Sequence, residues 1–108
     1  MALSKDEVMG TVRGFLERVS QRHDVRGAYL FGSCAKGMRT DHSDVDLAIV
    51  LGDIRKPEGS PYDESFEIFH EAQEYSSLLE VVCFTKEEFD QESGTLVKQI
   101  KKDSVKLL

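Results

Sequence analysis

Three short apolar runs, separated by stretches with helical spacing, set the strongest limits on the architecture of this chain. They are residues 27–31, 45–51 and 79–84. Runs of this length, bounded by glycine, serine or charged residues, are typical of β-strands, and the first two are apolar enough to be buried on both faces. Strands that alternate with helices form a sheet with helices packed against it. The sequence therefore predicts an α/β (α+β) fold with a mixed sheet of roughly three to four strands.

Helical patterns lie before and after the first run. Ser4 and Glu7 form a capping-box pattern, and the apolar residues that follow recur at helical spacing. These signals predict a first helix over about residues 5–22. A short helical turn is expected to begin at Ser33 and to end at Gly37, where glycine can adopt the backbone conformation that terminates a helix.

A second long helix is predicted to start near Ser60 and to end near Ser76, after a charged loop over residues 52–59. Its predicted apolar face consists of Phe66, Ile68, Phe69, Ala72, Gln73 and Tyr75. Thr85 and Glu88 repeat the capping-box pattern after the third strand. This repeat predicts a short helix directly behind that strand.

The C-terminal region is predicted to hold one more helix and a short apolar segment. Leu96, Val97 and Ile100 support the helix, and residues 105–108 form the apolar segment. Four lysines of this region are expected to form a solvated helix face, with partner binding as the alternative. They are Lys98, Lys101, Lys102 and Lys106.

Length and charge restrict the class of protein. The chain has 108 residues, which suits a single domain over residues 1–108, because domains typically hold about 100–150 residues. No apolar run approaches the roughly 20 residues of a membrane-spanning helix, and the first residues lack a signal peptide's apolar core. We therefore expect a cytoplasmic protein. The net charge of −6 argues against a broad basic surface, so long RNA or DNA is not an expected partner.

The cysteines and histidines suggest no metal site of their own. Cys34 and Cys83 are far apart in the sequence and have no metal-ligand spacing. They are expected to be reduced thiols packed near strands. His23 and His42 are expected to be ordinary surface histidines.

The residues that indicate a catalytic or binding site lie where the first predicted strand ends and the second begins. Gly32 and Ser33 end the first strand, and Asp44 and Asp46 begin the second. Side chains two residues apart on a strand point to the same face, so both carboxylates are expected to project together. Adjacent carboxylates repel each other unless a cation is bound, and Mg²⁺ prefers carboxylate and phosphate oxygens. The glycine and serine add a turn whose backbone can approach a phosphate closely.

A site for phosphate chemistry needs further groups around this pair. Glu80 is the candidate for a third carboxylate, because it opens the third strand, where a core role is hard to explain. Its alternative interpretation is a strand-edge residue in water. Lys36, or in second place Arg39, is a candidate for a phosphate contact, and an ordinary surface cation is the alternative for either.

The stretch from Gly32 to Asp46 resembles the DNA polymerase β nucleotidyltransferase superfamily, specifically its minimal nucleotidyltransferases, or MNT domains. The matching residues are Gly32 and Ser33, then ten intervening residues, then Asp44, Val45 and Asp46. Other positions that fit the motif are Ala35, Gly37, Ser43 and Leu47. The resemblance covers nearly the whole chain and implies the nucleotidyltransferase fold.

Carried over position by position, the resemblance implies that Asp44 and Asp46 bind catalytic Mg²⁺, with Glu80 in the place of the third carboxylate. The residues expected to bind the nucleotide are Gly32, Ser33, Lys36 and Ser43. Two positions depart from the family's usual pattern. The family often has Asp where this chain has Glu80, and Arg or another residue is common where Cys34 and Lys36 stand.

The activity implied by the resemblance is transfer of a nucleoside monophosphate, with AMP from ATP favoured, to a hydroxyl acceptor. Two Mg²⁺ ions are expected, one that helps to activate the hydroxyl and one that neutralises the triphosphate. The resemblance also implies a helical HEPN partner, and in some such pairs the MNT member is an antitoxin that adenylylates its toxin. Because the chain has no room for a second domain, a partner or a homodimer is expected to complete the site.

Two other functions are compatible with the sequence. The first is a non-catalytic binding module that neutralises its partner by contact. The second is an enzyme that modifies a small hydroxylated molecule such as an antibiotic, although the chain lacks a separate acceptor-binding domain. Nucleotide binding that depends on Mg²⁺ discriminates the enzymes from the binding module.

Overall fold

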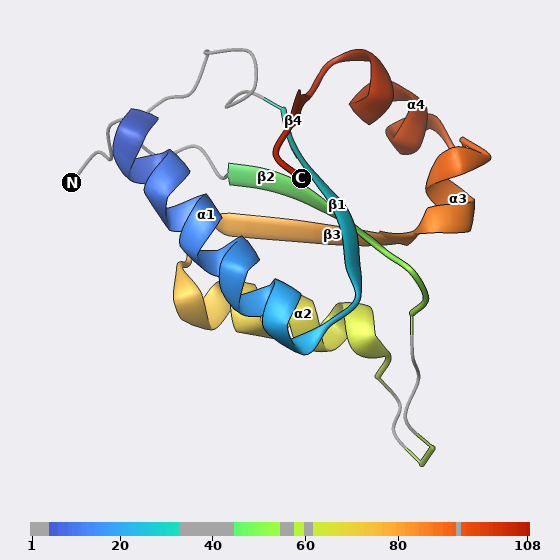
Figure 1. Ribbon diagram of the computed structural model, residues 1–108, viewed down its shortest axis with the longest axis horizontal. Helices are drawn as coiled ribbons and strands as arrows, with labels where there is room; N and C mark the ends of the chain where they lie inside the picture. Colours follow the sequence, from blue (N-terminus) through green and yellow to red (C-terminus); the bar gives the residue numbers. More distant parts are fainter. Residues whose placement is uncertain (1–4, 33–44, 55–57, 60–61, 93) are drawn as a thin grey trace.

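The computed structural model describes residues 5–32, 45–54, 58–59, 62–92 and 94–108, which form one sheet with helices on both of its faces (Figure 1). In chain order the elements are α1 (Lys5–Arg22), β1 (Val25–Phe31), β2 (Val45–Leu51), α2 (Glu64–Tyr75), β3 (Leu79–Thr85), α3 (Lys86–Asp90), α4 (Thr95–Lys102) and β4 (Val105–Lys106). The predicted α/β class with a small mixed sheet is therefore confirmed. The expected capping residue Ser4 and the expected turn from Ser33 to Gly37 lie outside the described residues.

The sheet has four strands in the order β3-β2-β1-β4. The central strand β2 is antiparallel to β1 and parallel to β3, and β4 adds to the far side of β1 in antiparallel orientation. In this order β3 and β4 are the two edge strands. Because β1 and β2 are antiparallel, the end of β1 lies beside the beginning of β2. Because β2 and β3 are parallel, the beginning of β3 also lies beside the beginning of β2.

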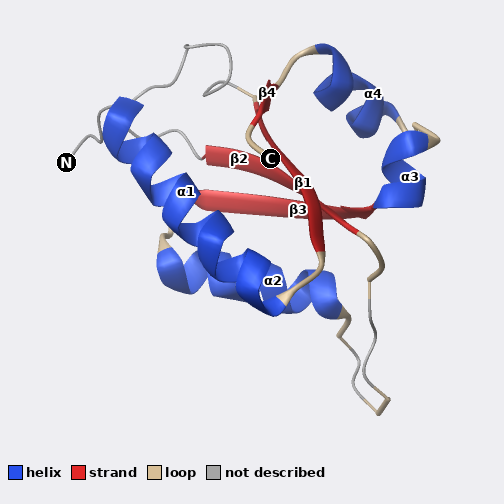
Figure 2. Cartoon of the chain, in the orientation of Figure 1, coloured by secondary structure: helices blue, strands red, loops and turns tan. Residues whose placement is uncertain are grey.

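Helices α1 and α2 cover one face of the sheet, and α3 and α4 cover the other (Figure 2). The larger core cluster lies under α1 and α2, and its largest fully buried side chains include Phe15, Leu47, Ile49 and Ile68. The smaller cluster joins alternate residues of β2, beginning at Ala48, to buried residues of α3 and α4. Successive residues of β2 therefore enter opposite layers, as the pleat of a strand requires.

The predicted burial of the first two strands is confirmed for β2 and wrong in part for β1. All residues of β2 except Asp46 are buried, whereas β1 buries Ala28 and Leu30 but leaves Tyr29 and Phe31 only partly covered. The two partly covered rings lie on the face of α3 and α4. These helices have 5 and 8 residues, and so they cover less of the sheet than α1 and α2 do.

The second long helix begins later than predicted and turns a different face to the core. Asp63 is its N-cap and accepts a hydrogen bond from the backbone N–H of Phe66, so the first helical residue is Glu64. The buried residues of the helix follow each other at a spacing of four, and they are Glu64, Ile68 and Ala72. The predicted apolar face is therefore wrong for Phe66, Phe69 and Tyr75, which are 37%, 39% and 40% exposed.

The C-terminal half agrees with its sequence signals. Thr85 accepts a hydrogen bond from the N–H of Glu88, and the Glu88 carboxylate accepts one from the N–H of Thr85. This reciprocal pair is the predicted capping box, and it starts α3 directly after β3. The predicted solvated helix face is confirmed for Lys98, Lys101 and Lys102, which are exposed on α4. It is wrong for Lys106, which is exposed but lies in β4. In the described ranges, no helix combines the length and the apolar character that crossing a membrane requires.

Candidate active site

The candidate site lies where three strand ends meet, and Asp46 is its central residue. Asp46 is the second residue of β2, two positions before Ala48, and so it shares the sheet face of Ala48. Its neighbours Val45 and Leu47 point to the opposite face, into the core under α1 and α2. Asp46 is half-buried, whereas the other residues of the strand are buried. The pleat thus directs one carboxylate away from the main core.

The sheet register brings Glu80 next to Asp46. Glu80 of β3 is the direct partner of Asp46 in the parallel pair, and Phe31 of β1 is its partner on the other side. Partners on neighbouring strands point to the same face, and neighbouring strands lie about 4.8 Å apart. Like charges placed directly opposite each other destabilise a sheet, so this pair of carboxylates suits a bound cation. The role of Glu80 as a third cation ligand stays a prediction.

Gly32 closes the site at the end of β1. Its φ is +73°, in the left-handed region that favours glycine. A Cβ atom added at this position would collide with Oδ2 of Asp46 and would lie 3.3 Å from Cγ of the same carboxylate. The backbone turn therefore packs directly against the Asp46 carboxylate, and only a residue without a side chain permits that approach.

We expect Gly32→Ala to lower both stability and cation binding. The left-handed backbone costs a non-glycine residue about 1–2 kcal/mol, and the new methyl group must also displace the Asp46 carboxylate. Urea denaturation measures the first effect, and calorimetric titration with Mg²⁺ and ATP measures the second. Gly59→Ala is the control, because Gly59 also has a positive φ, +80°, but an added Cβ would meet no atom of the described residues within 4 Å. Equal Mg²⁺ and ATP binding by both variants would contradict the proposed contact.

The other predicted site residues, Ser33, Lys36, Ser43 and Asp44, lie outside the described residues, as do Cys34, Arg39 and His42. Their roles stay predictions. Within the described ranges, no group of three or more histidine, cysteine, aspartate or glutamate side chains forms a metal cluster. The adjacent carboxylates of Asp46 and Glu80 are nevertheless hard oxygen donors of the kind that Mg²⁺ prefers. The donor chemistry of the described part therefore fits the predicted cation.

Cys83 has the wrong properties for a nucleophile. It is a free thiol in β3, as the sequence predicts. Burial, followed by the nearby negative charges of Asp63 and Glu64, raises the pKa of Cys83 from 9.0 to about 12. The reactive thiolate is therefore scarce at neutral pH.

We expect Cys83 to react with iodoacetamide at pH 8 at least about 100-fold more slowly than free cysteine does, measured by mass spectrometry on a Cys34→Ser chain. The raised pKa also fixes the sign of a stability change. Below pH 9.0 the thiol is neutral in both folded and unfolded chains, and between 9.0 and about 12 only the unfolded thiol ionises. Stability is therefore lost as pH rises through that window. Alkylation at the rate of free cysteine would contradict the burial.

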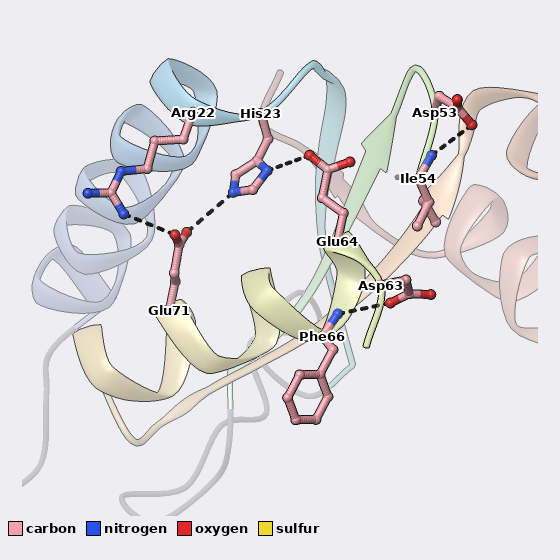
Figure 3. A network of polar contacts seen from close by, with 8 residues as sticks. All are labelled: Arg22, His23, Asp53, Ile54, Asp63, Glu64, Phe66 and Glu71. Atoms are coloured by element: carbon pink, nitrogen blue, oxygen red, sulfur yellow. Dashed lines mark hydrogen bonds and ion pairs between the residues drawn. The ribbon is translucent and has the colours of Figure 1, made fainter. Parts of the chain in front are cut away.

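His23 is not a surface histidine, so that prediction is wrong. Its ring lies between the end of α1 and helix α2, and its side chain is 6% exposed (Figure 3). Nδ1 lies 2.5 Å from Oε2 of Glu64, whose side chain is 4% exposed. Nε2 lies 3.5 Å from Oε2 of Glu71, an ion-pair distance that is too long for a good hydrogen bond. Arg22 donates to Oε1 of Glu71 at 3.0 Å and extends the cluster to the surface.

This polar cluster ties α1 to α2 and does not reach the carboxylates of the strand ends. The core-facing residues of α2 lie on the opposite face of the sheet from Asp46. The sequence does contain a signal for the cluster. Glu64 stands four residues before Ile68, at a core-facing position of the helix, where an acidic residue needs a buried partner.

Comparison with known proteins agrees with this architecture. The family described as "Polymerase beta, Nucleotidyltransferase" matches residues 16–108. Among solved structures, a protein from Sulfolobus solfataricus named as a nucleotidyltransferase is similar with a TM-score of 0.62 and 18% identity, over 94% of this chain and 80% of that chain. None of the curated proteins compared with the chain matches it.

Two further similar structures are toxin–antitoxin complexes. One contains AMP-PNP and is similar with a TM-score of 0.56 and 17% identity, over 98% of this chain and 73% of that chain. The other is a mutant of the MntA-HpeT pair, with a TM-score of 0.53 and 16% identity over the same shares. At these identities the similarity shows a shared fold.

Proposed function

Because the chain belongs to the Polymerase beta nucleotidyltransferase family, we propose that it transfers a nucleoside monophosphate, AMP from ATP, to a hydroxyl acceptor in the presence of Mg²⁺. The observation that carries the proposal is the direct pairing of Asp46 with Glu80 beside the turn at Gly32. The pair supplies adjacent carboxylates, and the glycine supplies a backbone that another group can approach closely.

The proposed cation ligands are Asp44, Asp46 and Glu80. When bound there, Mg²⁺ supplies positive charge that neutralises the triphosphate and favours loss of the hydroxyl proton. The proposed nucleotide-binding set is Gly32, Ser33, Lys36 and Ser43. The role of Gly32 in that set is to keep side-chain atoms away from the Asp46 carboxylate and from the phosphates.

In the proposed reaction, the acceptor oxygen bonds to the α-phosphorus of ATP and the bond to the β-phosphate breaks. Pyrophosphate leaves, and the hydroxyl proton passes to solvent. The protein contributes position and charge, and no side chain forms a covalent intermediate. The high pKa of Cys83 is consistent with a reaction that needs no thiolate.

We propose a helical HEPN protein as the acceptor, with the chain acting as its antitoxin. Two solved structures with this fold are toxin–antitoxin complexes, and one of them contains AMP-PNP. These observations support the proposal at the level of the fold. In this arrangement the partner, or a second copy of the chain, completes the acceptor side of the site.

The test uses the purified chain, a HEPN protein encoded beside it, Mg²⁺ and ATP labelled on either the α- or the γ-phosphate. Transfer of AMP puts the α-label on the HEPN protein and leaves the γ-label in pyrophosphate. Excess EDTA should abolish the labelling. Transfer of the γ-label would indicate phosphoryl transfer and would overturn the proposal.

The second candidate function is a non-catalytic antitoxin that neutralises its partner by contact. The exposed aromatic residues on the outer face of α2 favour it, because such residues are enriched at protein interfaces. Calorimetry separates the two functions. Nucleotide binding that requires Mg²⁺ supports the enzyme, whereas partner binding without any such nucleotide binding supports the contact antitoxin.

A further inference from the structure

Helix α2 and the residue before its cap present aromatic side chains to solvent beside the edge of the sheet. Tyr62, Phe66 and Phe69 are 51%, 37% and 39% exposed. The rings of Tyr62 and Phe66 stack with centroids 4.0 Å apart and an interplanar angle of 11°, and His70 packs edge-on against Phe66 at 4.5 Å. The rings thus pack against one another while they stay exposed. An exposed group of packed aromatic rings suits an interface.

A groove of about 500 Å³ runs between these rings and β3. Asp63, Phe66 and Phe69 line it on the helix side, and Val81, Val82 and Cys83 line it on the strand side. Val81 and Cys83 share one face of the sheet and Val82 faces the other. The groove therefore follows the edge of β3 itself.

The edge of β3 lacks most of the features that usually prevent pairing with another strand. It has seven residues, LEVVCFT, with no lysine or proline, and its single charged residue is Glu80, near its beginning. From Leu79 to Thr85, each residue of β3 pairs with one residue of β2, and the register has no bulge. Within the described ranges no strand lies beyond it, because β3 ends the sheet order. A regular edge of this length, apolar after Glu80 up to Phe84, is a template for an added strand.

The backbone direction of β3 identifies the groups that such a strand would meet. The carbonyl of Leu78 accepts from the N–H of Val45, which begins β2, and backbone groups alternate in direction along a strand. The backbone groups that point away from β2 therefore belong to Leu79, Val81, Cys83 and Thr85.

The two ends of this outward row already have partners. The side chain of Gln73 donates to the carbonyl of Leu79, and Glu88 accepts from the N–H of Thr85. The middle of the row, at Val81 and Cys83, faces the groove. An added strand would therefore bond to the middle of the edge, beside the aromatic rings.

The charge of this surface selects a basic partner. Helix α2 has neither lysine nor arginine. Of its four glutamates, Glu67 and Glu74 are exposed, whereas Glu64 and Glu71 belong to the cluster with His23. Asp63 lines the groove, and hydrogen bonds from Ser65 and from the backbone of Phe66 lower the pKa of its carboxyl, which keeps it negative at neutral pH. A second copy of the chain would place like charges against each other. A lysine or arginine side chain would instead meet carboxylates and aromatic faces together.

We propose that the outer edge of β3 and the aromatic face of α2 form a docking site for an extended, lysine- or arginine-rich segment of a partner protein. The segment adds to the sheet beside β3, and its backbone bonds to Val81 and Cys83. Its basic side chains lie against Asp63 and the rings of Phe66 and Phe69. The docking site uses other residues than the candidate active site, although Val81 directly follows Glu80 in β3. The proposal does not rest on the proposed function.

The probe is a fluorescent peptide of alternating valine and lysine, about ten residues long, with a valine and glutamate peptide as its counterpart. We expect the lysine peptide to bind the full chain and the glutamate peptide to bind at least about tenfold more weakly. Hydrogen exchange by NMR should show slower exchange of the Val81 and Cys83 amides when the lysine peptide is bound.

Two variants test the side-chain contacts without disturbing the core. Phe66→Ser removes an exposed ring, and Asp63→Ser removes the charge but keeps a hydroxyl that can cap α2. Each should weaken lysine-peptide binding by about tenfold. Leu96→Ser is the matched control, because Leu96 is 39% exposed on α4 and lies outside the groove. It should leave binding unchanged.

Four results would overturn the docking site. Equal binding of the two peptides would contradict the role of charge, and equal loss in Phe66→Ser and Leu96→Ser would indicate non-specific association. Unchanged exchange of the Val81 and Cys83 amides would exclude strand addition. A dimer in sedimentation that Phe66→Ser dissociates would show that the occupant is a second copy of the chain.

Discussion

Asp46→Asn is expected to reduce AMP transfer by about 10³-fold or more, because it removes one of the two carboxylates that meet at the strand ends. Asparagine has nearly the same shape as aspartate but lacks the negative charge that binds a divalent cation. We therefore expect a much smaller effect on folding than on activity. The measurements are α-label transfer and the midpoint of thermal unfolding, made on the same preparation.

Glu80→Gln should lower transfer in the same assay, since Glu80 is the direct cross-strand partner of Asp46. Glu74→Gln is the matched control, because Glu74 is an exposed carboxylate on α2, on the other side of the sheet. Full activity of Asp46→Asn would contradict the proposed site. An equal loss of AMP transfer in Glu74→Gln would show that the loss in Glu80→Gln comes from the change in overall charge.

His23→Ala is expected to destabilise the chain by about 3–5 kcal/mol, the cost of leaving a buried charge without its partner. The side chains of His23 and Glu64 are 6% and 4% exposed, so the Glu64 carboxylate has little access to bulk water in place of the lost imidazole (Figure 3). The loss is a large part of the roughly 5–15 kcal/mol by which domains are stable. Urea denaturation gives the free energy of unfolding.

Arg22→Ala provides the comparison, because Arg22 belongs to the same cluster but its side chain is 56% exposed. A surface ion pair of this kind contributes about 0–1 kcal/mol. The double variant His23→Leu with Glu64→Leu should recover much of the stability lost in His23→Ala, because it removes both polar groups together. Equal losses in His23→Ala and Arg22→Ala would show that burial does not govern the pair.

Local signals in the sequence predict most element boundaries correctly. Apolar spacing places the first helix at 5–22 and the second strand at 45–51, and the structure has them at Lys5–Arg22 and Val45–Leu51. The capping box at Thr85 and Glu88 also predicts the start of α3. Such signals depend on residues close together in the chain, so they can be recognised without the tertiary structure.

The predicted face of α2 is wrong because hydrophobicity and helical geometry disagree there. Hydrophobicity alone favours Phe66 and Phe69 over Glu64, but the helix groups Glu64 with Ile68 and Ala72. The buried glutamate is acceptable only because a histidine distant in the sequence lies against it. No local pattern reveals a partner of this kind, which is also why the prediction of a surface histidine fails.

Strands, capped helices and acidic residues at strand beginnings all follow from the sequence, because each is a local property of the chain. Only the tertiary structure determines which strands are neighbours. It places Glu80 directly opposite Asp46 and packs Gly32 against the Asp46 carboxylate. Register depends on pairing between distant segments, and a shift of one residue would turn either carboxylate to the other face. The same long-range packing buries His23 and leaves the edge of β3 open to the groove beside α2.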